Sequence, residues 1–517
     1  MCPTLNSKTL IRRFQVVAVL FATMLVAVAQ AAVPGVTSAS GSFNLTAAPS
    51  YLTQPDGASI YSWGYGCVSG STPSFAPAAI SGANCPTMQI TGPTLIVKEG
   101  QSVTVNLTNN LPPAAGNTSI LFPGFSVKSS GGTPGLLTQE AASGGSVTYT
   151  FTAMSPGTHA YYSGTQGDLQ IEMGLYGSII VLPSTPPANC SSGSSNDVAK
   201  VFNGETDFRL STAAYNHGAS CYDREYLFQF SEMDPLIHQQ ADAQKDLPCT
   251  RANGCMSIAT EPYHPAYFLI NGRSMPDLMD PNYAVQYPHQ PYNGNPHMHP
   301  GELVLLRVVG TGRWQHPFHE HGNHVRILGR DGNLLLSQND PTKLAGPLLF
   351  TTTTTPGTTL DGIFYWTGKG LNWDVYGHTA GDHSVCVPDA NGYYTADPTA
   401  PNYYEWCQDH AKPLEAHPFG AVGSGGPVTL PDANILTNGA WYGGSPYLGP
   451  DATARAVGST PIPPFGTVAN SPSQEAGFAY MWHSHNEREI TTNNAFPGGA
   501  MMMMLVDPRA FKINEAN

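Results

Sequence analysis

The chain has 517 residues, of which only 11% are charged, and its 36 acidic residues outnumber its 22 basic ones. This acidic balance argues against nucleic acid as a partner. The chain is rich in turn-forming residues, with 54 Gly and 45 Pro. Such a composition is typical of a turn-rich, extracellular all-β protein, and the length allows two to three domains.

The N-terminus has the three parts of a secretory signal peptide. Arg12-Arg13 precedes an apolar run from Phe14 to Ala29, and Ala29-Gln-Ala31 supplies the small residues of a cleavage site. We therefore predict a signal peptide over 1–31 and a secreted or periplasmic location. No later apolar stretch is long enough to span a bilayer, so no transmembrane segment is expected.

Eight cysteines remain after Cys2 leaves with the signal peptide, and an even number in an oxidising compartment favours disulfides. Spacing alone does not fix the pairing. Proximity in sequence favours Cys67–Cys85, Cys249–Cys255 and Cys386–Cys407, which leaves Cys190–Cys221.

Short β-branched runs separated by Gly and Pro follow the signal peptide. Ala32–Ser50 is small and polar, and we expect a loosely held lead-in there. The later runs predict a β-sandwich domain over about 44–183, and the Pro/Ser/Gly-rich stretch 184–198 is expected to be a linker.

A second domain is predicted over 199–510. Its strand-like runs include 224–230, 267–272 and 302–309, the last leading directly into a histidine-rich motif. The region 368–476 is rich in Gly, Pro, Tyr and Asp and has no repeating core pattern. A structureless loop of this length is unusual in a compact domain, so we expect an insertion that packs as a lid over one end of the sandwich.

Two His-x-His pairs carry the chemistry. One pair is His319 and His321, and the other is His483 and His485. Alternate side chains of a strand share a face, so each pair points one way. Two such strands meeting edge to edge would bring four imidazoles together, and imidazole is the commonest side-chain metal ligand.

These segments, His316-Pro-Phe-His-Glu-His321-Gly and Met481-Trp-His-Ser-His485, resemble the last cupredoxin domain of the multicopper oxidases. That family carries His-Pro-x-His-x-His-Gly and then His-Cys-His, a further His and a Gly-Met. The resemblance implies an all-β fold of two cupredoxin-like Greek-key sandwich domains, the second with the long loop-rich insertion. It also implies copper as the cofactor and, as in two-domain relatives, a homotrimer.

Two positions depart from the family pattern. Ser484 stands where the family has the copper-binding Cys, and Glu489 where it has the next His. His316 survives, and Met501 is the candidate axial ligand. A blue-copper site needs a thiolate, so the electron-entry copper is expected to be lost.

The first domain carries the second departure. Segments 116–124 and 157–164 align with the family's first two histidine pairs, but the four ligand positions are Leu121, Pro123, Tyr162 and Gly164. The resemblance therefore implies fewer copper ions than the family's usual set, held by His319, His321, His483 and His485.

Other possible metal ligands in the sequence have simpler explanations. His297-Met-His299, beside Pro300, is expected to be a solvated loop rather than a second copper site. The Met501–Met504 run could bind Cu(I), but alternate methionines packing into the core is the favoured interpretation. Glu320 should point away from the histidine face.

Three functions remain open from the sequence. The first is a secreted, copper-binding oxidoreductase of the multicopper oxidase type that lacks the blue-copper cysteine. The alternative is a degenerate, non-catalytic cupredoxin scaffold with a binding or structural role in the envelope or extracellular matrix. The third is metal-assisted hydrolysis with Glu487 or Glu489 as base. The sequence identifies neither a substrate nor a partner molecule.

Overall fold

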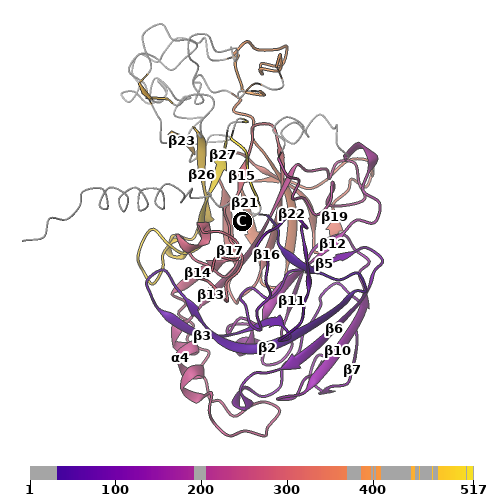
Figure 1. Cartoon of the computed structure of the whole chain (residues 1–517), viewed down its shortest axis with the longest axis vertical. Helices are drawn as coiled ribbons and strands as arrows, with labels where there is room; N and C mark the ends of the chain where they lie inside the picture. Colours follow the sequence, from indigo (N-terminus) through magenta and orange to yellow (C-terminus); the bar gives the residue numbers. More distant parts are fainter. Residues whose placement is uncertain are drawn as a thin grey trace, which may run out of the picture.

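A computed structural model of the chain describes residues 32–190, 205–369, 386–397, 400, 403–408, 444–448, 453–454, 468–469, 476–507, 509 and 511–515. The predicted signal peptide (1–31) lies outside these residues, as does most of the predicted insertion. Figure 1 shows the first half of the chain below and the second half above.

The first half forms a sandwich of two five-stranded sheets. One sheet has the order β11 (Gly157–Tyr162), β12 (Tyr176–Leu182), β5 (Leu95–Lys98), β1 (Gly35–Thr37), β4 (Ser74–Ala76). The other has the order β3 (Ser59–Cys67), β2 (Ser42–Thr53), β6 (Ser102–Asn109), β10 (Ser146–Thr152), β7 (Lys128–Ser130). A small ribbon joins β8 (Thr133–Pro134) to β9 (Gln139–Glu140).

The expectation of a loose lead-in over Ala32–Ser50 is wrong. This stretch forms β1 and most of β2, and β2 lies between β3 and β6. The alternating Phe43, Leu45 and Ala47 are buried in the core of the first sandwich. Half-buried strands need apolar residues only at every second position, which made this one look polar in sequence.

The second half forms a larger sandwich. Its first sheet has the order β14 (Tyr267–Ile270), β13 (Arg224–Met233), β16 (Leu303–Gly310), β22 (Thr359–Tyr365), β18 (Val325–Arg330), β19 (Asn333–Leu334), with β20 (Leu348–Leu349) also on β18. Its second sheet has the order β15 (His297–Met298), β27 (Met501–Val506), β26 (Ala476–Ser484), β17 (His316–Glu320), β21 (Thr351–Thr354), with β23 (Gly444–Leu448) also on β26. A separate ribbon pairs β24 (Thr453–Ala454) with β25 (Val468–Ala469).

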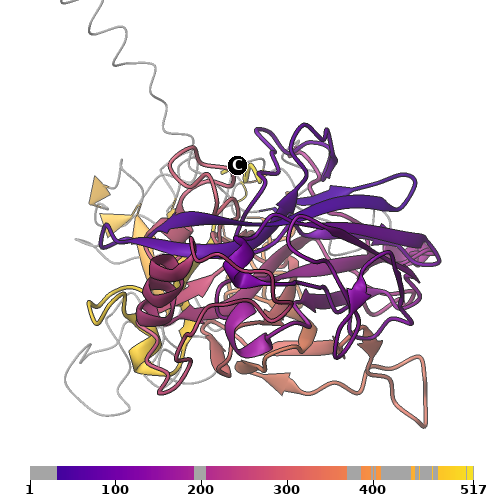
Figure 2. The same cartoon turned by 90° about the horizontal axis from the view of Figure 1, so that it is seen from below.

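The α-helices among the described residues are few and short. They are α2 (Gly167–Gln170) and α4 (Pro235–Gln244), the latter capped by the Asp234 side chain, which accepts a hydrogen bond from the Leu236 backbone N–H at 2.9 Å. Although α4 follows β13 of the second sandwich, it packs beside β3, and Ile237 and Ala241 enter the core of the first sandwich (Figures 1 and 2). Within the described part of the chain, no helix has the length and apolar character needed to cross a membrane.

The two sandwiches also share buried polar contacts. Asp361 on β22 accepts hydrogen bonds from the Thr158 backbone N–H at 3.0 Å and the Thr158 hydroxyl at 2.6 Å, across the boundary between the sandwiches. Each sandwich has its own apolar core. The predicted fold class, all-β with cupredoxin-like sandwich domains, is therefore confirmed. The exact domain boundaries stay predictions.

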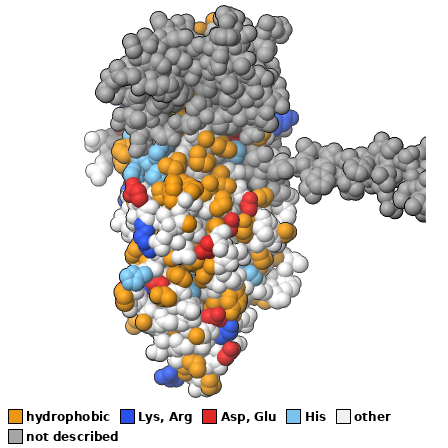
Figure 3. All heavy atoms as spheres, turned by 90° about the vertical axis from the view of Figure 1, so that its left-hand side faces the viewer, with side chains coloured by type: hydrophobic (Ala, Val, Ile, Leu, Met, Phe, Trp, Pro, Cys, Tyr) orange, Lys and Arg blue, Asp and Glu red, His pale blue; other side chains and the backbone are white. Residues whose placement is uncertain are grey.

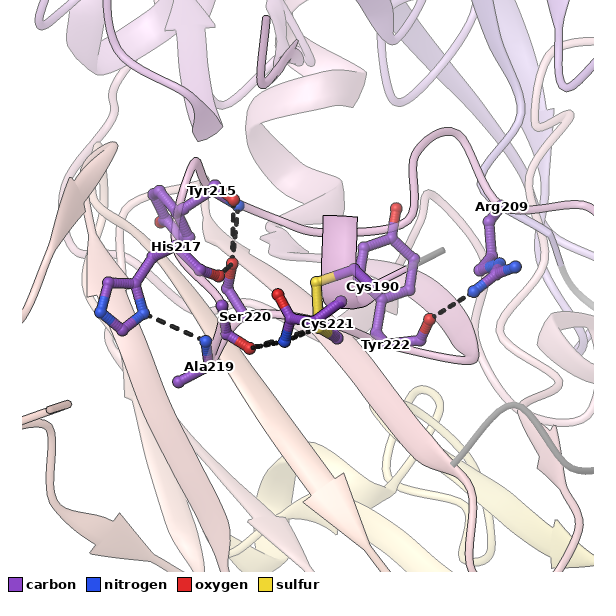
Figure 4. The surroundings of a disulfide bond; sticks show 10 residues. Cys190, Arg209, Tyr215, His217, Ala219, Ser220, Cys221 and Tyr222 are labelled. Atoms are coloured by element: carbon purple, nitrogen blue, oxygen red, sulfur yellow. Dashed lines mark hydrogen bonds between the residues drawn. A yellow bond between two sulfur atoms is a disulfide. The ribbon is translucent and has the colours of Figure 1, made fainter. Parts of the chain in front are cut away.

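All four expected disulfides are present: Cys67–Cys85, Cys190–Cys221, Cys249–Cys255 and Cys386–Cys407. Figure 4 shows Cys190–Cys221, which ties the end of the first sandwich to a turn in which the Ala219 backbone N–H donates to His217. In the described part of the predicted insertion, β23 extends the sheet by pairing with β26.

Candidate metal centre

The two His-x-His segments meet as predicted. They lie where the two interior strands β17 and β26 pair, with His319 directly opposite His483 and Phe318 opposite Ser484. Directly opposed residues in an antiparallel pair share a face of the sheet. His319, His321 and His483 therefore project from one face, while Phe318 and Trp482 project from the other into the second core.

The four imidazoles form one cluster. Ring centroids of His319 lie 4.7 Å from His321, 5.6 Å from His483 and 4.7 Å from His485. The Nε2 atoms of His321 and His483 are 3.2 Å apart. His319, His321 and His483 are buried, whereas the His485 side chain is 44% exposed. The cluster thus has a closed inner part and one arm open to solvent.

Hydrogen bonds fix the state of His483. Its Nδ1 lies 2.7 Å from the Ser484 backbone carbonyl oxygen, which can only accept, so Nδ1 carries the proton. Nε2 of the neutral ring is then left with its lone pair directed toward His321. A backbone carbonyl that fixes the tautomer in this way is the usual support of a metal-binding histidine.

Lowered pKa values favour the neutral form of His319 and His483. Burial, together with the nearby His485 and His483, lowers the pKa of His319 to about 4. Burial also lowers the pKa of His483. Neutral imidazole is the form that binds a metal, so near pH 7 these two rings are ready as ligands without losing a proton.

The four imidazoles are ligands that suit copper, but only two of them are already placed to bind one ion. Imidazole suits copper, zinc, iron and nickel. Among the described residues, no three of the four histidines bring their ligating nitrogens within 4.8 Å of one another; the one group that does is Cys386, Glu405 and Cys407, whose cysteines form a disulfide. His321 and His483 are therefore the preformed pair, and the other rings must turn to join them.

His316, the fifth predicted ligand, lies apart from this cluster. It occupies β17 three residues before His319 and so projects from the opposite face, where it is fully buried. Its Nε2 donates to Glu232 at 2.9 Å and its Nδ1 donates to Glu489 at 2.7 Å. Because both ring nitrogens donate to carboxylates, His316 is an imidazolium.

Electrostatics support this assignment. Burial alone would lower the pKa of His316, but the hydrogen bonds to Glu232 and Glu489 outweigh it and raise the pKa to about 9. Ser484 completes the group by donating its hydroxyl proton to Glu489. The residues at the blue-copper position thus form a filled ion-pair network, with no thiolate and no free imidazole nitrogen. This set does not fit a blue-copper ion.

The expectation of Met501 as an axial sulfur beside His316 is wrong. Met501 lies directly opposite His483 on β27 and so shares the face of the histidine cluster. Glu320 does point away from that face, as predicted; its carboxylate accepts from the Thr352 hydroxyl, and burial raises its pKa to about 8.

The first domain keeps the strand pairing but not the ligands. The Leu121 backbone N–H donates to the Tyr162 carbonyl at 2.7 Å, and the reverse bond is 3.2 Å. The two segments aligned with the family's first histidine pairs are thus neighbours. Gly164 lies against Leu121, since a Cβ there would come within 2.8 Å of the Leu121 Cγ. Leucine, proline and glycine side chains offer no metal-binding atom at these positions.

His297 and His299 are not in a solvated loop. Both are fully buried. His297 Nδ1 lies 2.6 Å from Asp507, and His299 Nε2 lies 2.9 Å from Glu205. Both partners are distant in sequence, so the local sequence showed only the adjacent proline, which suggested a loop. The sequence also did not indicate that Glu232, which lies 84 residues before His316, is its partner.

One family of known proteins matches part of the chain. The family model described as "Multicopper oxidase" matches residues 84–186. The multicopper oxidase MCE of Talaromyces pinophilus is 34% identical over 119 residues, which are 22% of this chain and 19% of that protein. The match thus spans about a fifth of the relative's length.

Solved structures were compared as well. The multicopper oxidase mgLAC is 14% identical with a TM-score of 0.46, covering 92% of this chain and 88% of that one. The blue copper oxidase of Nitrosomonas europaea is 14% identical with a TM-score of 0.44, covering 90% and 85%. The resemblance to multicopper oxidases drawn from the sequence is confirmed by the family model over residues 84–186 and by the curated relative.

Proposed function

We propose that this chain is a secreted, multicopper-oxidase-like protein that binds copper at His319, His321, His483 and His485 and has no blue-copper electron-entry site. One observation carries the proposal: His321 and His483 hold their Nε2 atoms 3.2 Å apart. Cleavage after Ala31, detected as a mature chain that begins at Ala32, tests the secretion part.

The separation of the pair suits two ligands of one ion. Imidazole nitrogens bind first-row metals at about 2.0–2.1 Å. Two nitrogens that far from one ion and 3.2 Å apart subtend an angle of about 100°, which lies within the tetrahedral and square-planar ranges. The ion would replace the one hydrogen bond that now joins the two rings.

The surrounding residues would then orient the other ligands. The Thr351 hydroxyl lies 2.8 Å from His319 Nδ1, so Nε2 of that ring is the nitrogen left to face the cluster. His485 is the exposed arm, and its Nδ1 lies 3.3 Å from Glu487. Bound copper would supply a change of oxidation state; the protein supplies a buried pair of imidazoles and one solvent-facing ligand.

Oxidation of substrates through a blue-copper centre is not part of this proposal. The electron-entry position holds the His316 imidazolium between Glu232 and Glu489. An imidazolium has no lone pair with which to bind a metal ion.

The second candidate is a non-catalytic scaffold. It is favoured by Leu121, Pro123 and Gly164, which replace the first domain's ligands with side chains that bind no metal. In that case the histidine cluster is an inherited hydrogen-bonded group. The homotrimer implied by the family resemblance belongs to either candidate, and the mass of the particle in light scattering tests it.

Metal content decides between the candidates. The purified chain is loaded with Cu(II), freed of excess metal, and analysed by elemental analysis and absorption. We expect about one copper per chain without an intense blue band. The His321→Ala, His483→Ala double variant should lose it, while His217→Ala, which changes a partly buried histidine near Cys221, should keep it. Equal copper in both variants, or none in the wild type, would leave the scaffold function.

A further inference from the structure

The face that carries the histidine cluster also carries methionines. On the paired strands β26 and β27, Met481 lies directly opposite Met503, and His483 lies directly opposite Met501. Opposed residues share a face, and so do residues two apart on one strand. Met481, Met501 and Met503 therefore project from the same side as His483.

The methionine run is divided between the two faces of the sheet. Met502 and Met504 are fully buried in the second core, as expected from the sequence. Met501 is 5% exposed, whereas Met481 and Met503 are only partly buried. The interpretation that alternate methionines pack into the core is thus confirmed. Burial in the core does not account for Met481 and Met503.

The spacing lets three thioethers converge. Directly opposed residues have Cβ atoms about 4.5–5.5 Å apart, and diagonal neighbours about 7–8 Å. The methionine side chain has three rotatable bonds, so three sulfurs that start at these Cβ positions can reach one ion. Thioether sulfur is a soft ligand that selects Cu(I) over harder ions such as Mg²⁺ or Ca²⁺.

Little else among the described residues competes for a soft ion. The eight described cysteines all form disulfides, so they present no thiolate. Figure 3 shows histidine and hydrophobic side chains side by side on one face of the molecule. Met481 and Met503 keep part of their surface exposed, so a small ion can reach this face.

We propose that Met481, Met501 and Met503 form a binding site for one soft monovalent ion, Cu(I), beside the four-histidine cluster. The site goes beyond the proposed function because imidazoles alone do not distinguish Cu(I) from Zn²⁺, whereas thioethers do. It does not depend on Cu(II) binding by His321 and His483. No change of oxidation state is involved in the binding step.

The test uses Ag(I), a soft monovalent ion with the charge of Cu(I) and no redox chemistry under these conditions. The full chain, with Cys2 alkylated beforehand, is labelled with ¹³C at the methionine methyl groups and titrated with Ag(I). The chain has 15 methionines, and leucine variants assign the signals. We expect the methyl signals of Met481, Met501 and Met503 to shift together and saturate at one equivalent.

Matched variants separate the site from the core. Methionine-to-leucine changes conserve volume and cost under about 1.5 kcal/mol, so every variant should fold. Met481→Leu with Met503→Leu should weaken Ag(I) binding at least tenfold in a competition titration. Met502→Leu with Met504→Leu makes the same changes on the opposite face and should leave the affinity within threefold of the wild type.

Two results would overturn the proposal. One is an unchanged Ag(I) affinity in the Met481/Met503 variant; the other is an equal loss in both methionine pairs. The His321→Ala, His483→Ala variant separates this proposal from the copper(II) site, because it should lose Cu(II) and keep Ag(I) binding within threefold. Failure of the copper(II) site alone therefore leaves the methionine site standing.

Discussion

The buried imidazolium at His316 predicts a specific pH dependence of stability. Its pKa rises from 6.5 to about 9 in the folded protein, through its two carboxylate partners. Each factor of ten in proton affinity is worth about 1.4 kcal/mol, so the proton contributes about 3 kcal/mol to folding. Because the folded pKa is raised, this contribution is fully present below about pH 6.5 and is lost as the pH rises through 9.

The perturbation is His316→Gln, which keeps a polar side chain but cannot become a cation. Urea unfolding of the wild type and the variant is measured at pH 6 and at pH 9.5. We expect the difference in unfolding free energy between the two proteins to shrink by about 3 kcal/mol at the higher pH. His217→Gln, which removes a partly buried ring beside the Pro341 carbonyl oxygen, should show no such change. A difference for His316→Gln that is the same at both pH values would refute the imidazolium assignment.

Other predictions follow from core packing, from a glycine turn and from the residues at the electron-entry position. Ser484→Cys with Glu489→His restores a thiolate and removes the Glu489 partner of His316 Nδ1, so the double variant should develop an intense blue band with Cu(II), while Glu489→His alone should not. Met504→Ala removes a fully buried side chain from the second core and should lower the unfolding free energy by about 2–5 kcal/mol in urea titrations, and a loss under 1 kcal/mol would contradict the packing. Gly174→Ala places a Cβ onto the Ile90 side chain at a φ of +115° and should cost at least about 2 kcal/mol, seen as a lower melting temperature; an unchanged melting temperature would show that the turn relaxes freely.

Local patterns predicted the parts of the site that depend on strand period alone. Each His-x-His pair shares a face because side chains alternate along a strand. The two motifs lie side by side on paired strands, so His319 lies opposite His483. Strand period gave no guide to Met501, which follows His485 after a turn; its assignment as an axial ligand came from the family resemblance and is wrong. The intervening residues include a 3₁₀ turn, Glu487–Ile490, and a turn adds no fixed number of half-periods.

Long-range partners could not be read from the sequence. His316 owes its charge to Glu232, which comes from β13. His297 and His299 owe their burial to Asp507 and Glu205. A histidine pattern indicates where rings gather, but the groups that face each ring depend on how distant strands pack. Those groups decide whether the ring is a ligand, an ion-pair member or a structural donor.

The placement of α4 has a consequence for how this chain is made. The core of the first sandwich is completed by Ile237 and Ala241, which the ribosome adds more than fifty residues after β12 ends at Leu182. The first sandwich therefore cannot close while the nascent chain is shorter than about 240 residues. During synthesis an apolar groove beside β3 stays open to chaperones, and a truncated chain ending at the linker would expose it permanently.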